Sequence, residues 1–376
     1  MITNPLLYLF ILAISATFFY VLEQGTQLKI FKFIPSIVML YAFVMGLASL
    51  GIFEYNQEIN AIYKLTKTNL LPAMIFLMLL QVDIRLFFRL GNKLILSYVL
   101  AVVSLGFAFF LVSIIFSFDE GMAGAFGALA GSWMGGTANM VAVGSALGVS
   151  DVAFGYALIV DSFNYTLWVA LLLFLVPFAK IFNKFIGSQG VDAVFGDIGC
   201  ACTIGAKRYW LLIILSLIVS FISQLIATKL SIISATTTMV IMATLFGVLA
   251  SFTKLREFNG SSEVASSMLY MLIALIGSKA VFESFSGVGT YVFAGFIILL
   301  IHAIVMMLGA KLFKLDLFSI SVASLSNIGG IASAPILAAT YNKSLVSIGV
   351  MMAIMGYIIG TFGGLLVGNI LMGISR

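Results

Sequence analysis

Residues 121–148 read GMAGAFGALAGSWMGGTANMVAVGSALG, and this stretch decides the fold. It is apolar enough for a membrane, yet its centre carries a glycine pair and three polar side chains: Ser132, Gly135, Gly136, Thr137 and Asn139. Paired glycines weaken a helix because Gly loses more backbone freedom on ordering than other residues. The stretch predicts two short helices that meet at an unwound, polar tip. Because non-helical backbone survives at membrane depth only where protein buries it or water reaches it, the tip is a predicted binding site.

The same pattern occurs a second time in the chain. With a shift of 194 residues, Ser326, Gly329, Gly330 and Ala332 fall on Ser132, Gly135, Gly136 and Ala138. The predicted binding residues of this second tip are Ser326, Asn327, Gly329, Gly330 and Ser333. Paired, glycine-interrupted apolar segments in corresponding places of two halves point to a transporter built from repeats. The alternative is that the glycine pairs serve only as helix-packing surfaces. The polar residues that recur beside both pairs favour the binding-site interpretation.

Composition places the chain in a membrane. Of its 376 residues 62% are hydrophobic and 9% are charged, whereas soluble domains carry about 25% charged residues. No basic residue precedes the first apolar run, so we interpret that run as a retained span and not as a signal peptide. The net charge of +5 comes from Lys and Arg residues in short loops, where they determine topology and do not indicate a nucleic-acid partner.

An apolar run of about 20 residues predicts one membrane span. In the first half such runs cover 4–22, 33–53, 69–82, 92–118 and 153–182, and in the second half 208–229, 231–252, 264–280, 286–310 and 344–372. The broken segments are 121–148 and 315–340. We therefore predict an all-α polytopic membrane protein with a first repeat at 1–182, a cytoplasmic linker at 183–207 and a second, inverted repeat at 208–376. Each repeat has five spanning helices and one broken, re-entrant helical hairpin.

The positive-inside rule tests whether the broken segments dip into the membrane or cross it. If both dip and the N-terminus is outside, most of the 19 Lys and Arg residues lie inside. If every segment crosses, the basic residues divide almost evenly between the two sides. The dipping arrangement also gives each half an odd number of crossings, so the halves are inverted relative to each other. Both termini are then predicted to be external.

One carboxylate lies deep in an apolar run. Asp161 has no basic neighbour in sequence, and an ionisable group in a span is by default a functional hypothesis. Asn164 follows three residues later, on the same helix face. Asp161, Asn164 and carbonyl groups of a broken helix would form an all-oxygen Na⁺ site; alternatively, Asp161 with a pKa raised by desolvation would carry a proton. A structural role, in which Asp161 caps a neighbouring broken helix, stays open.

The polar side chains of the two tips are neutral donors and acceptors. They suit a carboxylate or another polar solute, and they suit Na⁺ equally; hydroxyls in membrane helices also bond the backbone four residues earlier. Enzyme motifs such as H-E-x-x-H, G-K-[ST] and G-x-S-x-G are missing, and the chain has a single His. We therefore expect no enzyme activity and no cofactor beyond a coupling ion.

The tip residues also resemble a known family. Residues 131–143, GSWMGGTANMVAV, and residues 326–335, SNIGGIASAP, look like the signature of the YjcL-like family of bacterial integral membrane proteins. This resemblance implies a protein of the plasma membrane and gives no substrate. The tips are more remotely similar to the Gly-Gly-x-Gly hairpins of the 2-hydroxycarboxylate and glutamate:sodium symporters. Here the fourth position is Ala138 and Ala332, a departure that puts the substrate class in doubt, and that likeness implies a homodimer by analogy.

These observations lead to one main functional hypothesis. We expect a cation-coupled secondary transporter, driven by Na⁺ or H⁺, that moves a small polar or anionic organic solute by alternating access around the two tips. An ion or solute channel is the alternative, because broken helices also line pores. An intramembrane enzyme that modifies lipid is a third possibility, and it would need more than one buried acid.

Overall fold

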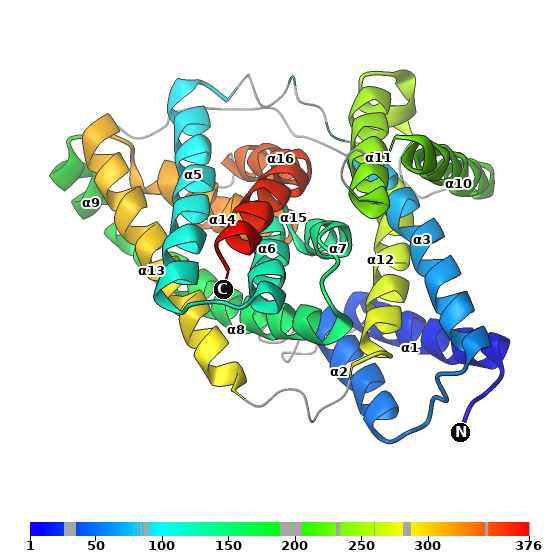
Figure 1. Cartoon of the computed structure of the whole chain (residues 1–376). Coiled ribbons are helices and arrows are strands. Elements are labelled where there is room, and N and C mark those ends of the chain that lie inside the picture. Colours follow the sequence, from blue (N-terminus) through cyan, green and yellow to red (C-terminus); the bar gives the residue numbers. More distant parts are fainter. Residues whose placement is uncertain are drawn as a thin grey trace. The chain divides into compact units, whose positions relative to one another are not determined.

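The computed structural model describes residues 1–25, 35–80, 82, 85, 90–188, 205–230, 234–258, 260–280, 287–342 and 345–375 (Figure 1). The chain folds into two compact units. Unit 1 comprises Met1–Gln81, Gly144–Ser162 and Cys202–Gly289, and unit 2 comprises Val82–Val143, Phe163–Ala201 and Thr290–Arg376. Each unit therefore combines segments from both halves of the sequence.

The described residues are almost entirely helical, which confirms the predicted all-α membrane class. The helices of the first half are α1 (Pro5–Gly25), α2 (Ser36–Ser49), α3 (Gln57–Leu80), α5 (Asn92–Ile115), α6 (Glu120–Gly135), α7 (Thr137–Ala146), α8 (Asp151–Leu175) and α9 (Ala179–Ile186). The second half contains α10 (Ala206–Lys229), α11 (Ala235–Ser251), α12 (Ser261–Gly277), α13 (Val288–Phe313), α14 (Leu317–Ile328), α15 (Gly330–Tyr341) and α16 (Val346–Ile374). Six of the described helical segments are long and apolar enough to cross a membrane.

The order of helices in the second half repeats the order in the first. Helices α10 to α13 follow one another as α1, α2, α3 and α5 do, and each series then continues with two short helices and a long one. The broken elements lie where the glycine pairs predict them, because α6 ends at Gly135 and α14 ends at Ile328. An inverted relation between the halves stays a prediction. Most of the linker at 183–207, including 189–204, lies outside the described residues.

Helix α3 differs from its prediction. Its apolar part was expected at 69–82, but the helix begins at Gln57. The predicted span was defined by its apolar residues alone. A helix can extend beyond the hydrocarbon core of the membrane where water solvates its side chains. The added turns carry Glu58, Lys64 and Lys67, and they make the first half of α3 polar.

Unit 1 is built around α3. Helices α10, α11 and α12 pack against α3, and α12 in turn contacts α1 and α2. The apolar half of α3 is buried from Leu71 to Leu80 with only small exposure. Gly247 of α11 allows close packing, since a Cβ there would lie 2.7 Å from the Cβ of Leu79.

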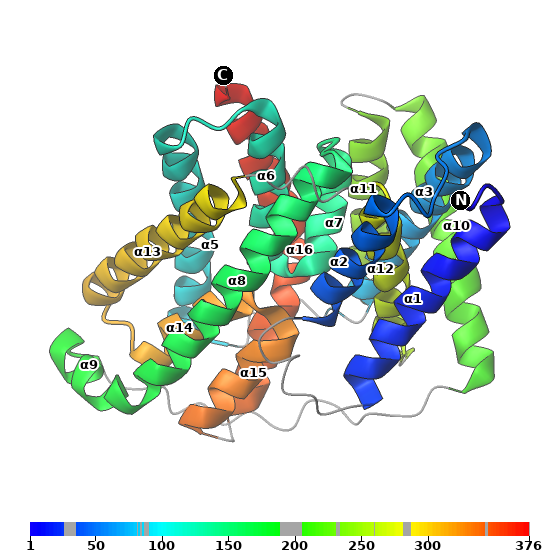
Figure 2. The ribbon, with the colours of Figure 1, turned by 90° about the horizontal axis from the view of Figure 1, so that it is seen from below.

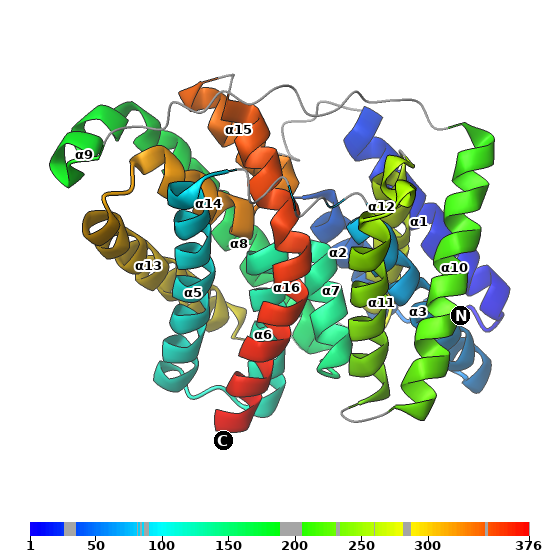
Figure 3. The same ribbon diagram turned by 90° about the horizontal axis from the view of Figure 1, so that it is seen from above.

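Unit 2 is organised by the contact between α6 and α16, which lie side by side (Figure 3). The two backbones touch: a Cβ on Gly360 would lie 2.7 Å from the Cα of Gly135, and one on Gly364 would lie 2.6 Å from the Cα of Gly131. Small residues spaced by four allow such close approach between helices in a membrane. Because Gly360 lies against Gly135 and Gly364 against Gly131, α6 and α16 run in opposite directions.

Candidate functional site: two hairpin tips

Helices α6 and α7 form a hairpin, which we call hairpin 1. A Cβ on Gly131 of α6 would lie 2.9 Å from a methyl group of Val143 on α7. In one continuous helix these residues would be about 18 Å apart, so the chain reverses between them. Helix α6 is about 24 Å long and α7 about 15 Å, and neither reaches the roughly 30 Å of a bilayer core.

Helices α14 and α15 form a second hairpin, hairpin 2. The rings of Phe318, near the start of α14, and Tyr341, at the end of α15, are 5.4 Å apart between centroids. These residues are separated by 23 positions, which would correspond to about 34 Å along one helix. Both arms are about 18 Å long, so this element also returns to the end from which it starts.

The two hairpins start from opposite ends of unit 2. Because α6 runs antiparallel to α16, the start of hairpin 1 lies at the end of α16 that carries the C-terminus (Figure 2). Hairpin 2 ends at Tyr341, a few residues before α16 begins at Val346. Its tip points along α16 from there, since Ala334 contacts Gly349 near the start of α16. The tip of hairpin 1 lies beside Gly356 and Gly360, in the middle of α16.

The unwound part of tip 1 is a single non-helical residue between α6 and α7. Gly136 has φ 88° and ψ 170°, a backbone region that essentially only Gly adopts. One such residue is enough to reverse the chain, so no further unwinding is needed. Gly135 must be glycine for a different reason, which is steric: a Cβ there would lie 2.0 Å from the carbonyl oxygen of Gly356.

Asn139 closes tip 1 through its side chain. Its amide nitrogen donates to the carbonyl of Gly135 at 2.7 Å and approaches the carbonyl of Gly356 at 3.4 Å. The hydroxyl of Thr361 donates to its amide oxygen. Asn139 therefore ties both arms of hairpin 1 to α16. Sequence reasoning proposed Asn139 as a ligand-binding residue and missed Thr361, because no local pattern reports a contact across 222 positions.

The other residues predicted at tip 1 lie beside this network. Ser132 is buried, and its carbonyl accepts from the backbone N–H of Gly136 at 2.6 Å. Thr137 is half-buried and begins α7. The hydrogen bonds at tip 1 therefore close the hairpin on itself and on α16.

Tip 2 also reverses the chain at a glycine pair, but its polar contacts differ from those of tip 1. Gly329 has close neighbours, since a Cβ there would lie 2.0 Å from the hydroxyl oxygen of Ser333 and 2.8 Å from the ring of Tyr165 on α8. Gly330 has φ +58°. The amide nitrogen of Asn327 donates to the carbonyl of Ala323 at 2.9 Å.

Three buried oxygen atoms at tip 2 have no hydrogen-bond partner within the described part of the protein. They belong to the side chains of Ser326, Asn327 and Ser333. Ser326 and Asn327 are fully buried, and Ser333 is nearly so. Tip 2 thus presents unpaired oxygen atoms where tip 1 presents completed hydrogen bonds.

A buried His anchors hairpin 2 to its neighbours. Ser104 donates to the carbonyl of Ala101, so its oxygen accepts from Nδ1–H of His302 at 2.6 Å. The Nε2 atom of His302 then accepts from the hydroxyl of Ser324 at 2.8 Å, while Ser324 accepts from the indole N–H of Trp168 at 2.9 Å. When the imidazole of His302 is neutral, both of its nitrogen atoms have a hydrogen-bond partner. The network joins α5, α8, α13 and α14. Its role is to hold hairpin 2 in place.

The predicted coupling residues lie on α8. Asp161 is half-buried and lies about 15 Å from the start of the helix, within an apolar span. Asn164 is buried, and its amide nitrogen donates to the carbonyl of Val292 on α13 at 3.1 Å. Asp161 belongs to unit 1 and both tips belong to unit 2, so a site shared by Asp161 and the tips stays a prediction.

Hard cations prefer oxygen ligands, and tip 2 supplies these from hydroxyl and amide groups. Among the described residues no three His, Cys, Asp or Glu side chains lie together as a possible metal site. Binding of Na⁺ by the oxygen atoms of Ser326, Asn327 and Ser333 stays a prediction.

The two tip glycines with positive φ should differ in their tolerance of Asn. Neither would bring a Cβ within 4 Å of another atom, so only backbone conformation separates them. Asn visits the left-handed helical region, which matches the φ of Gly330, but not the region of Gly136. We expect Gly136→Asn to lower the unfolding free energy by roughly 1–3 kcal/mol, and Gly330→Asn to have a clearly smaller effect. Thermal unfolding of the purified variants measures this, and equal losses would contradict the assigned tip geometry.

Comparison with known proteins identifies a family. The family model described as "Protein of unknown function (DUF819)" matches residues 9–374. No curated protein is matched. The match agrees with the resemblance to an uncharacterised bacterial membrane family, whereas the likeness to symporters stays a prediction. Because the match spans both hairpins and nearly all of the sequence, the chain belongs to the DUF819 family.

Proposed function

We propose that this protein is a cation-coupled secondary transporter of a small polar or anionic organic solute. Na⁺ or H⁺ serves as the coupling ion, and access alternates around the two hairpin tips. The proposal includes the cell membrane as its location and a homodimer as its assembly, as the sequence resemblance implies. The observation that carries it is the group of unpaired buried oxygen atoms at tip 2.

Unpaired buried polar atoms are costly. Each one left without a partner costs roughly 1–3 kcal/mol, and buried polar groups in native proteins are nearly always hydrogen-bonded. Three such atoms on two turns of backbone around one glycine pair therefore favour a ligand-binding role for Ser326, Asn327 and Ser333. The hydroxyl groups can donate to a carboxylate or accept from a donor, and all three oxygen atoms can coordinate Na⁺.

The arrangement of helices supports transport over a static role. Hairpins that start from opposite ends and bring their tips toward the middle of a helix bundle are typical of secondary transporters. The carboxyl ends of α6 and α14 and the amino ends of α7 and α15 meet at the tips. Helix-end partial charges of both signs therefore lie there, which suits a cation together with an anionic group of the solute. On α8, Tyr165 contacts Gly329 of tip 2.

Removing a ligand oxygen should stabilise the ligand-free protein. Ser326→Ala and Ser333→Ala each delete an unpaired buried hydroxyl, and we expect the unfolding free energy without ligand to stay unchanged or rise by up to about 1 kcal/mol. If Na⁺ is the coupling ion, replacing choline chloride by NaCl should stabilise the wild type, and this gain should fall in both variants. Thermal unfolding in detergent measures both effects.

Ser104→Ala is the matched control, because its hydroxyl is buried with partners on both sides. This variant should lower stability in both salts and leave the difference between them intact. Coupling to H⁺ predicts no difference between the salts and a pH-dependent transport rate instead. Marked destabilisation of Ser326→Ala and Ser333→Ala in choline chloride would mean that these hydroxyls are structural, and it would remove the main support for a site at tip 2.

A further inference from the structure

Unit 1 contains a cavity of about 570 Å³ that is separate from the hairpin tips. It lies between α3, α10, α11 and the segment that joins α7 to α8. Its volume falls within the range of roughly 300–1,000 Å³ typical of sites for small molecules. The polar residues that line it include Tyr63, Lys64, Lys67, Gln224, Thr228 and Thr236, and no acidic side chain lines it.

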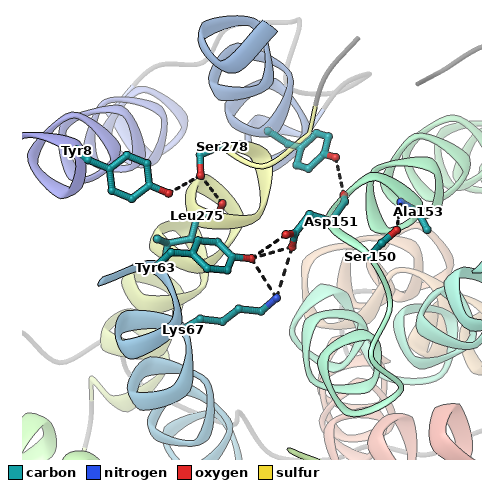
Figure 4. Close-up of polar contacts among 9 residues, drawn as sticks. Tyr8, Tyr63, Lys67, Ser150, Asp151, Ala153, Leu275 and Ser278 are labelled. Atoms are coloured by element: carbon teal, nitrogen blue, oxygen red, sulfur yellow. Dashed lines mark hydrogen bonds and ion pairs between the residues drawn. The ribbon is translucent and has the colours of Figure 1, made fainter. Parts of the chain in front are cut away.

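Asp151 lies beside Lys67 and accepts hydrogen bonds from a tyrosine as well. The hydroxyl of Tyr63 donates to both carboxylate oxygens of Asp151, at 2.8 and 3.0 Å (Figure 4). Asp151 is also the first residue of α8, where the helix dipole favours a negative charge. Tyr41 donates to its backbone carbonyl at 3.0 Å. Asp151 therefore has hydrogen-bond partners other than Lys67.

Lys67 is held only loosely by this cluster. Its ammonium nitrogen lies 3.5 Å from one carboxylate oxygen of Asp151 and 3.3 Å from the hydroxyl of Tyr63, both long for hydrogen bonds to an ammonium group. Lys64 lies three residues earlier on the same helix face and forms no ion pair with any residue that the structure describes. Like charges at this spacing repel each other, and an anion placed between them would relieve the repulsion.

The opposite wall offers neutral polar groups. Thr228 donates its hydroxyl to the carbonyl of Leu225, so its oxygen remains as an acceptor. The amide nitrogen of Gln224 is engaged by Asn69 and Ser220 at 3.1 Å. The lysines that line the cavity lie on α3, and the polar groups of α10 that line it carry no charge. The carboxylate of Asp151, 3.5 Å from Lys67, is a charged group with which a bound anion would compete.

We propose that this cavity, the α3 pocket, binds a small anion through Lys64 and Lys67. The ligand class is a carboxylate- or phosphate-bearing group of metabolite size, which two neighbouring ammonium groups can hold as point charges. Such a group is found on free solutes and on anionic lipid headgroups. The site lies in unit 1, and it does not depend on the proposed transport function.

The test is binding of defined anions to the full-length protein in nanodiscs of phosphatidylcholine. Inorganic phosphate and citrate are titrated against thermal unfolding, with sodium chloride at matched ionic strength as the reference. A saturable stabilisation is expected for at least one of them. Lys64→Gln and Lys67→Gln should each weaken the affinity at least fivefold, and the double variant should abolish it. Arg at both positions should retain binding because the charges remain.

Lys229→Gln is the matched control, since Lys229 is an exposed lysine at the end of α10 that does not line the pocket. It should bind as the wild type does. In a second arm, phosphatidylglycerol replaces part of the phosphatidylcholine. Stabilisation of the wild type but not of the double Lys variant by this lipid would assign the anion site to a headgroup. Wild-type binding by the double variant, or no specific effect of phosphate, citrate or phosphatidylglycerol, would overturn the proposal.

Discussion

The variant Gly360→Val is expected to lose its folded state in detergent under conditions where the wild type is stable. A Cβ on Gly360 would lie 2.7 Å from the Cα of Gly135 and 2.8 Å from the side chain of Asn139. Neither can move away easily, because one is backbone and the other closes tip 1. Overpacking at a tight contact costs about 1–3 kcal/mol, occasionally more, and separating α6 from α16 would add the loss of the main helix contact in unit 2.

Gly373→Val is the matched control for this prediction. Gly373 lies on the same helix, and a Cβ there would have no atom within 4 Å. The two substitutions add the same side chain to the same helix, so only the contact with hairpin 1 separates them. Size-exclusion profiles and unfolding temperatures should show a near wild-type protein for Gly373→Val. Equal stability of the two variants would contradict the close packing of α6 on α16.

The variant Asp161→Asn is expected to abolish net uptake driven by an ion gradient. The substitution removes a charge in the middle of an apolar span and keeps the size and one oxygen. Exchange of solute across the membrane should persist, because exchange does not require the empty carrier to return. If Na⁺ is the coupling ion, Na⁺ raises the affinity for solute and the solute raises the affinity for Na⁺ by the same factor in the wild type. Asp161→Asn should lose both effects.

Glu58→Gln is the control for Asp161→Asn, because Glu58 is an exposed carboxylate in the first turn of α3. It should transport as the wild type does. Uptake is measured in proteoliposomes under imposed Na⁺ and pH gradients, with exchange assayed in parallel. Unchanged gradient-driven uptake by Asp161→Asn under both gradients would mean that Asp161 does not bind the coupling ion and has a structural role.

The helical order could be predicted because it depends on local properties of the sequence. Apolar length defines a span, and the glycine pairs at 135–136 and 329–330 interrupt one, so both broken elements were found at the correct residues. The start of α3 at Gln57 was missed, since hydrophobicity does not mark where a polar helix begins outside the hydrocarbon.

The contacts of the site were harder to predict than its position. The glycine pairs identified the tips, but the sequence could not show that the side chain of Asn139 bonds to Thr361 and Gly356. Nor could it show that the hydroxyl oxygens of Ser326 and Ser333 have no partner among the residues that the structure describes. These differences arise from contacts between helices far apart in the chain. The cavity beside Lys64 and Lys67 could not be predicted for the same reason. From the sequence alone these lysines serve only as topology determinants, because the residues that surround them in space are not known.

The most direct measurement of the proposed function is accumulation of solute by the wild-type protein in proteoliposomes. Radiolabelled citrate, glutamate and inorganic phosphate are supplied outside, and an inward gradient of Na⁺ or H⁺ is imposed or omitted. Coupled transport predicts that at least one solute saturates its uptake and rises inside above its external concentration, and that this occurs only with one of the two gradients. Flux that does not saturate and never exceeds the external concentration, or uptake of every solute that ignores both gradients, would contradict it.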